Sequence, residues 1–152
     1  MRVADYITDF LFKNGIKTSF MLSGTGSVFL DDAFANYAGM SYVSARHESA
    51  AVMMAVGYYK LSQKPGVALV TTGPGGANAV GGVVEAWVDS VPTIIISGQV
   101  ESKFLDKDLR YFGVQGLNIL PIIKPITKFS KTITDPYSIQ YYLDKALYFA
   151  LE

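Results

Sequence analysis

Glu48 stands at the head of an almost uninterrupted apolar stretch, and its carboxylate has two interpretations. Residues 45–60 read ARHESAAVMMAVGYYK, and the positions on the same helical face as Glu48 are apolar or aromatic. The other faces are apolar too, so we expect this helix to be buried nearly all round. In such shelter, desolvation favours the protonated form of a carboxylate, whereas a helix N-terminus favours the charged form. Glu48 is therefore either a first-turn dipole partner, with Arg46 or His47 as neighbour, or a buried acid–base group.

Two glycine-rich loops are the other candidates for chemistry. Residues 23–27 read SGTGS and residues 73–78 read GPGGAN, each after an apolar run. Both begin Gly-x-Gly, but Phe29 and Asn78 occupy the third glycine position of the dinucleotide fingerprint, and no Gly-Lys-Ser/Thr is present. Glycines at the carboxyl end of a parallel strand let the backbone approach a ligand closely. Two interpretations of these loops remain, a structural turn and a loop that faces a ligand. The incomplete fingerprints argue against a phosphate-binding loop.

Alternating helix and strand patterns position these groups. We expect helices over residues 3–14, 28–37, 45–63, 77–89 and 136–151, and strands over 17–22, 41–44, 67–72, 93–97 and 126–133. Ser44 is the expected cap of the helix that carries Glu48. Continuous apolar strands are typical of a parallel sheet covered on both faces. The predicted fold class is α/β, a doubly wound, mainly parallel sheet with helices on both faces.

Composition narrows the class of protein. The 152 residues carry 13 Lys+Arg and 13 Asp+Glu, so no net charge attracts nucleic acid or an anionic membrane. Cysteine is absent and His47 is the single histidine, so we expect no metal site in this chain. No signal peptide and no apolar stretch of membrane-spanning length occurs, which favours a cytoplasmic location. Only 17% of the residues are charged, so we expect a face buried against another domain or subunit.

Several motifs follow one another in a fixed order between residues 46 and 100. They are His47-Glu48, Ala55-Val56-Gly57-Tyr58, Thr71 to Asn78, Asp89-Ser90-Val91-Pro92 and Gly98-Gln99-Val100. This order resembles the N-terminal, pyrimidine-binding domain of thiamine diphosphate-dependent enzymes of the acetolactate synthase type. The resemblance extends over the whole chain, including FGVQGLNILPIIKPITK at residues 112–128, and it implies the thiamine diphosphate-binding α/β fold.

The resemblance also implies roles for individual residues. Glu48 corresponds to the glutamate that hydrogen-bonds the aminopyrimidine of thiamine diphosphate, favouring the imino tautomer that generates the ylide. That ylide attacks a 2-oxo acid such as pyruvate, and carbon dioxide leaves. Gly24, Pro74 and Asn78 correspond to loop residues that approach the cofactor. Gln115 corresponds to a glutamine on the substrate side.

Two departures limit what the resemblance implies. Residues 22–25 read Leu-Ser-Gly-Thr where synthases usually have Tyr-Pro-Gly-Gly, which leaves the acceptor substrate open. The diphosphate and Mg²⁺ are held in this family by a separate domain with a Gly-Asp-Gly and Asn-Asn signature, which this chain lacks. That domain comes from a partner subunit in the assembled site. The resemblance does not decide whether FAD is bound.

We therefore expect residues 1–152 to form a single pyrimidine-binding domain, the N-terminal fragment of a longer enzyme. The chain alone is expected to be catalytically inactive and to self-associate at least as a homodimer. Three alternatives remain: a natural small subunit paired with a diphosphate-binding chain, a 2-oxo acid decarboxylase, and a noncatalytic binding or assembly module with the same fold.

Overall fold

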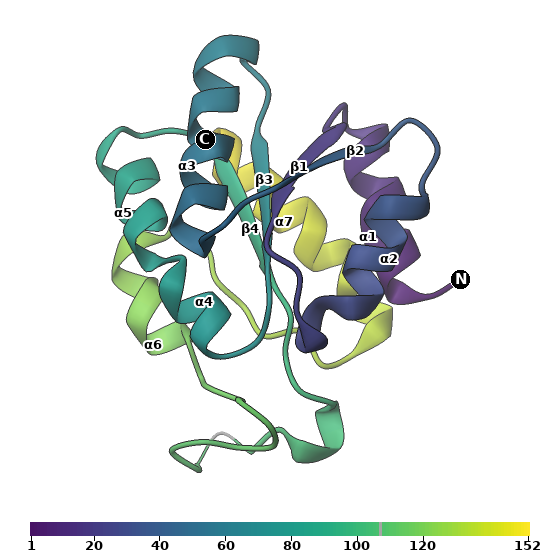
Figure 1. The fold of residues 1–152 in the computed structure, drawn as a ribbon, viewed down its shortest axis with the longest axis vertical. Helices are drawn as coiled ribbons and strands as arrows, with labels where there is room; N and C mark the ends of the chain where they lie inside the picture. The colour runs from purple at the N-terminus through teal and green to yellow at the C-terminus, as the bar shows by residue number, and fades with distance from the viewer. Residues whose placement is uncertain (107) are drawn as a thin grey trace.

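A four-stranded parallel sheet forms the centre of the computed structural model, which describes residues 1–106 and 108–152 (Figure 1). The strands are β1 (Thr18–Met21), β2 (Ser41–Ser44), β3 (Gly66–Val70) and β4 (Thr93–Ser97), in the order β2-β1-β3-β4. Each strand pairs in parallel with its neighbours, with Phe20 opposite Val43 and Ala68, and Ala68 opposite Ile95. The predicted mainly parallel α/β sheet is confirmed.

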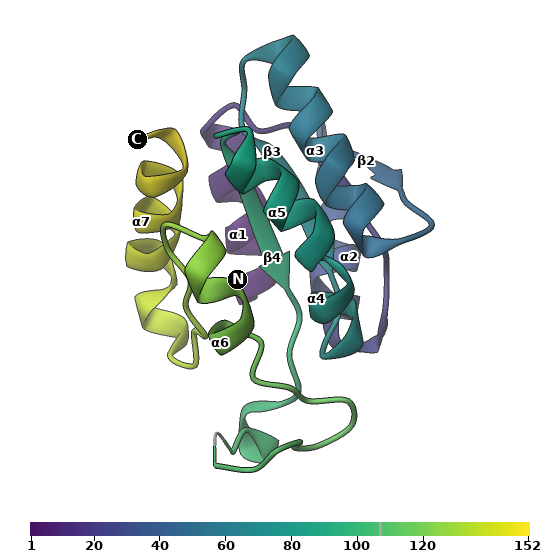
Figure 2. The same cartoon turned by 90° about the vertical axis from the view of Figure 1, so that its left-hand side faces the viewer.

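Helices cover both faces of this sheet (Figure 2). They are α1 (Val3–Lys13), α2 (Val28–Asn36), α3 (Glu48–Ser62), α4 (Pro74–Asn78), α5 (Val80–Val88), α6 (Leu120–Ile123) and α7 (Ile139–Leu151). Short 3₁₀ turns occupy Thr25–Ser27, Ser102–Phe104, Lys124–Ile126 and Pro136–Ser138. The described residues contain no helix that is both long and apolar enough to cross a membrane.

Alternation along β3 divides the core into two layers, because successive strand residues face opposite sides of a sheet. Val67 and Leu69 pack in a cluster with residues of α1, α2 and α7, among them Leu11 and Phe34. Ala68 and Val70 lie in the other cluster, against α3. The small residues on that side, which include Ala51 and Ala55 as well as Ala68, bring α3 close to the sheet.

Four predictions about the elements are wrong, and the first concerns the start of α3. The helix begins at Glu48 rather than at residue 45, and its cap is His47 rather than Ser44. The amide of Ala45 donates instead to the carbonyl of Met21 at 2.8 Å, which continues the pairing of the strands past Ser44. A residue whose amide serves the sheet cannot also lie in the first helical turn.

Burial of α3 is also less complete than predicted within this chain. One side of the helix is fully buried, with Ala51, Val52, Ala55 and Val56 at 1% exposure or less. Met53 and Met54 are 44% and 37% exposed on another side. Part of the apolar surface of α3 is therefore left uncovered by the rest of this chain.

The predicted strand over residues 126–133 does not form. Residues 127–135 have no regular structure, and Pro125 lies within the 3₁₀ turn before them. Phe129 stacks on two rings of α7, Tyr142 at 6.4 Å and Phe149 at 6.0 Å between ring centroids. The half-buried Phe129 thus packs against a helix instead of in the sheet. In addition, the helix predicted over 77–89 is divided into α4 and α5, and it starts earlier, at Pro74.

Candidate functional site

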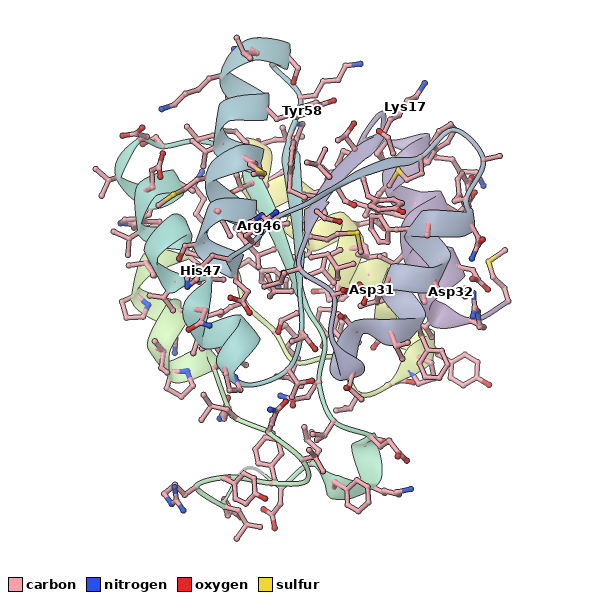
Figure 3. The ribbon with its side chains drawn as sticks, in the orientation of Figure 1. Lys17, Asp31, Asp32, Arg46, His47 and Tyr58 are labelled. Atoms are coloured by element: carbon pink, nitrogen blue, oxygen red, sulfur yellow. The ribbon has the colours of Figure 1, made fainter. Side chains whose placement is uncertain are left out.

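The loops that follow β1, β3 and β4 leave the same edge of the sheet, at its lower end in Figure 1. Carboxyl ends of parallel strands are where open α/β sheets bind ligands. The first turn of α3 lies at this edge too, because α3 packs on α4 and α5. Figure 3 shows Arg46 and His47 at this start of α3.

The Glu48 side chain is buried at the N-terminus of α3, with only 7% of the residue exposed. Its Oε2 accepts a hydrogen bond from Nδ2 of Asn78 at 3.1 Å. Its Oε1 faces Gly75, since a Cβ built on that glycine would lie 3.5 Å from this oxygen. None of the ion pairs among the described residues includes Glu48, so it is no ion-pair partner of Arg46 there. The carboxylate has one oxygen held and one oxygen available.

Two neighbours of Glu48 fix the start of α3. His47 has an extended backbone, and its Nδ1 accepts a hydrogen bond from the amide of Ser49 at 3.2 Å, as an N-cap does. The hydroxyl of Ser49 donates to the backbone carbonyl of Asn78. The side-chain amide of Asn78 donates to the Glu48 carboxylate, so two hydrogen bonds join the beginning of α3 to the end of α4. The geometry therefore gives the Glu48 carboxylate a defined position.

Thr71, directly after β3, separates the two glycine-rich loops. A Cβ on Gly24 would lie 2.7 Å from the Thr71 side chain, and a Cβ on Gly75 would lie 2.7 Å from Cγ2 of Thr71. Its Oγ1 accepts a hydrogen bond from the amide of Gly26 at 3.1 Å. The glycines are thus required by close packing on Thr71, which supports the structural-turn interpretation without testing the ligand-facing one. Sequence reasoning did not single out Thr71, although its place at the end of an apolar strand was visible.

The remaining predicted site residues lie around this centre. Pro74 is exposed in the first turn of α4, and Asn78, also exposed, ends that helix beside Glu48. Gln115 is exposed, with a left-handed backbone at φ +63°. A Cβ on Gly73, whose φ is +58°, would lie 1.8 Å from the carbonyl oxygen of Gln115. The turn that carries Gln115 therefore packs on the start of α4, and its predicted contact with substrate stays a prediction.

Asp31 of α2 belongs to the same region and was missed. Its Oδ2 accepts a hydrogen bond from the hydroxyl of Ser27 at 3.0 Å. Burial raises the pKa of Asp31 above its usual range, and the hydrogen bond from the Ser27 hydroxyl and the nearby amide of Gly24 partly oppose this. Figure 3 shows Asp31 above the turn that begins α2, with Asp32 farther out on the same helix. A pair of adjacent aspartates in an otherwise apolar helix was the available signal.

A separate cavity of about 220 Å³ lies beyond the end of β4. It is lined by Gln99, Leu105, Phe112, Asn118, Leu120 and Thr132. Gln99 is engaged by its own surroundings, since its Nε2 donates to the carbonyl of Leu117 at 3.1 Å and its Oε1 accepts from the amide of Val100. Glu48 does not line this cavity, so the cavity lies apart from the Glu48 carboxylate. Within residues 1–106 and 108–152, no cluster of three His, Asp or Glu side chains is placed to hold a metal ion.

Comparisons with known proteins agree with this geometry. Residues 1–111 match the family model described as thiamine pyrophosphate enzyme, N-terminal TPP binding domain. The chain is 37% identical over 147 residues to the acetolactate synthase large subunit of Haemophilus influenzae. The aligned residues make up 97% of this chain and 25% of that protein. This chain is 38% identical over 136 residues to the corresponding subunit of Lactococcus lactis, covering 90% of this chain and 23% of that one. For the chloroplastic acetolactate synthase of Arabidopsis thaliana, identity is 32%, over 97% and 21% of the two chains.

The chain therefore spans about a quarter of the length of these relatives. Its sheet, its two glycine-rich loops and its buried Glu48 all lie within the part that matches. The chain belongs to the thiamine pyrophosphate enzyme family, as an N-terminal TPP-binding domain that matches acetolactate synthase large subunits.

Proposed function

We propose that this chain supplies the pyrimidine-binding half of the active site of an acetolactate synthase-like enzyme, which decarboxylates a 2-oxo acid and joins the product to a second one. The observation that carries the proposal is the Glu48 carboxylate, 7% exposed, with Oε2 held by Asn78 and Oε1 facing Gly75. The full enzymatic activity is inferred from relatives four times as long.

The residues around Glu48 fit a flat nitrogen heterocycle such as an aminopyrimidine. Gly75 has no side chain, which leaves the space beside Oε1 of Glu48 open. A Cβ at this position would lie 3.5 Å from that oxygen and narrow the approach to it. A buried carboxylate exchanges a proton with a ring nitrogen under weak screening by water. Asn78, which donates to Oε2, fixes the orientation that leaves Oε1 for this exchange. Gly24, Pro74 and Asn78 are the proposed cofactor-contacting residues of the loops, and Gln115 is the proposed contact on the substrate side.

Thiamine diphosphate, when bound, supplies the carbanion-stabilising chemistry that 2-oxo acid decarboxylation needs. Glu48 would hold and return the proton at its Oε1, and the packed loops around Thr71 would keep water away from that atom. We further propose that residues 1–152 are one domain of a longer enzyme, whose other domain holds the diphosphate and Mg²⁺. FAD binding is not assigned to any residue of this chain.

A product assay tests the proposed function. The full-length protein with thiamine diphosphate and Mg²⁺ is expected to release carbon dioxide from pyruvate and form acetolactate, whereas residues 1–152 alone are expected to do neither. Carbon dioxide with free aldehyde and no new carbon–carbon bond would instead identify a decarboxylase. No product from a panel of 2-oxo acids, with intact folding and no cofactor binding, would contradict the enzyme and leave the binding or assembly module. Calorimetric binding of the cofactor to the isolated chain would contradict the separate diphosphate domain.

We also propose that a second copy of the chain covers the exposed apolar surface of α3 and α5. That surface contains Met53, Met54, Val84, Trp87 and Val88, which are 37–71% exposed. The relatives from Haemophilus influenzae and Lactococcus lactis are named large subunits, so those proteins have partner chains. Apolar and aromatic residues at this exposure are typical of the centre of an interface.

Substituting the tryptophan of this surface tests the association. Light scattering of the chain over a concentration series is expected to show a dimer that Trp87→Asp weakens by tenfold or more in Kd, about the size of an interface hot spot. Tyr137→Asp is the matched control, because Tyr137 is 96% exposed outside α3 and α5. A monomer at all concentrations, or equal weakening by both substitutions, would contradict the proposed surface.

A further inference from the structure

The hydroxyl of Ser27 is the centre of a small buried network beneath the first glycine-rich loop. Ser27 is 1% exposed, and its Oγ accepts a hydrogen bond from the amide of Gly24 at 3.2 Å. The same Oγ lies 3.1 Å from the carbonyl oxygen of Gly24 and 3.0 Å from Oδ2 of Asp31. Both of these oxygens are potential acceptors, yet a hydroxyl has one hydrogen to donate.

The protonation state of Asp31 decides where that hydrogen goes. A charged carboxylate is the stronger acceptor, so Ser27 donates to Asp31, and the carbonyl of Gly24 keeps only its hydrogen bond from the backbone amide of Ser27, at 3.0 Å. A protonated Asp31 donates to Ser27 Oγ instead, which frees the Ser27 hydrogen for the Gly24 carbonyl. The hydrogen bonds then run without interruption from Asp31 through Ser27 to Gly24.

The surroundings of Asp31 make its protonation easier than for an aspartate in water. Its Oδ1 is buried without a hydrogen-bond partner among the described residues, and burial is the main cause that raises the pKa of Asp31. No ion pair described in the structure includes this carboxyl. The charged groups of α1, which packs on α2, pair elsewhere: Arg2 with Asp5 and Asp32, and Lys13 with Asp9, which also accepts from Tyr37. Strand β2, which also contacts α2, carries no ionisable group except Tyr42.

The loop that this network holds leads to the proposed site through direct contacts. Gly24 packs on the side chain of Thr71, the amide of Gly26 donates to Oγ1 of Thr71, and Gly75 packs on Cγ2 of the same threonine. Gly75 in turn faces Oε1 of Glu48. A change in how firmly Gly24 is held is therefore passed to the wall of the site by contacting atoms.

We propose that Asp31 is a positioning residue whose proton, relayed by Ser27, sets how firmly the loop of residues 24–27 is held against Thr71. This inference rests on the proposed function only for its consequence, since the network itself lies within the chain. The direction follows from linkage. The closed loop disfavours the charged form, so protonation stabilises the closed loop, and that stabilisation is lost as the pH rises through the raised pKa of Asp31.

Amide hydrogen exchange of the full-length protein tests the inference without cofactor. The protection of residues 22–28, corrected for intrinsic rates, is measured from about pH 4 to pH 8, around and above the usual pKa range of Asp. Protection in the wild type is expected to fall as the pH rises, by about tenfold for each unit by which burial raises the Asp31 pKa. Asp31→Asn cannot titrate and retains a donor toward Ser27, so we expect high protection of the loop at every pH.

Two further variants make the result specific. Asp32→Asn is the matched control, because Asp32 is the adjacent carboxylate of α2 and pairs with Arg2 at 2.7 Å. It is expected to behave as the wild type. Ser27→Ala removes the relay, so the loop is expected to lose protection even at the low-pH end, also if Asp31→Asn does not fold.

A pH dependence that persists in Asp31→Asn or that disappears in Asp32→Asn would overturn the inference, and so would full low-pH protection of the loop in Ser27→Ala. These outcomes are independent of the proposed function, because exchange is measured without cofactor. Cofactor binding provides the second readout: where the loop responds as expected, the affinity for thiamine diphosphate is expected to follow the same pH profile in the wild type and to lose it in Asp31→Asn. A loop that responds in a protein with no affinity for the cofactor would contradict the proposed function and leave the network intact.

Discussion

Glu48→Gln in the full-length enzyme is expected to slow exchange of the thiazolium proton of bound thiamine diphosphate by about 10²–10⁴-fold, the usual contribution of a positioned acid–base group. Gln keeps the shape of the side chain, and its amide can still contact Asn78, but it cannot take up or return a proton. Because Glu48 is buried and Oε1 is its available oxygen, no solvent-exposed carboxylate replaces it there. Exchange of the proton for deuterium, followed by rapid quench and NMR, measures this step separately from carbon–carbon bond formation.

Glu101→Gln is the matched control for this experiment. Glu101 undergoes the same chemical change, but it is exposed and pairs with Lys103 at 2.6 Å. Its exchange rate is expected to equal that of the wild type. If Glu48→Gln binds the cofactor and exchanges its proton at the wild-type rate, Glu48 has no part in the mechanism.

Continuous apolar runs between helical patterns were sufficient to predict the parallel sheet but not the ends of its elements. The run VALVTT at residues 67–72 predicts a strand buried on both faces, and β3 has five consecutive buried residues. The start of α3 depended instead on which group the amide of Ala45 meets, and that group is the carbonyl of Met21, far away in the sequence. Ser44 and His47 are both plausible caps by residue type, so only the position of β1 distinguishes them.

Residues of the candidate site were located by motif, whereas their contacts were not predictable from local pattern. Glu48 and Asn78 stand 30 positions apart, and their hydrogen bond depends on how α3 packs against α4 and α5. Thr71 stands at the end of an apolar strand and begins the motif Thr71 to Asn78, but the sequence does not show that the two glycine-rich loops both contact it. Asp31 likewise gains its raised pKa from burial that only the packed fold provides.

Gly98→Ala is expected to lower the free energy of unfolding by about 1–3 kcal/mol, the usual cost of an overpacked position. The loop after β4 crosses close to the first glycine-rich loop, and a Cβ on Gly98 would lie 2.2 Å from the carbonyl oxygen of Gly26 and 2.8 Å from the amide nitrogen of Ser27. These are backbone atoms, so no side-chain rotation relieves the clash. The amide of Gly98 also donates to the carbonyl of Val70 at 2.9 Å, which prevents the loop from withdrawing.

The glycine that begins the Gly-Gln-Val motif is thereby explained by packing at the edge of the site. Urea unfolding of the chain measures the cost, and Gly57→Ala is the matched control. Gly57 lies within α3 and has nothing within 4 Å of a built Cβ, so its substitution is expected to raise stability by up to about 1 kcal/mol through helix propensity. If Gly98→Ala unfolds at the same urea concentration as the wild type, the two loops are not in contact there. That result would contradict the packing of the first glycine-rich loop against the end of β4.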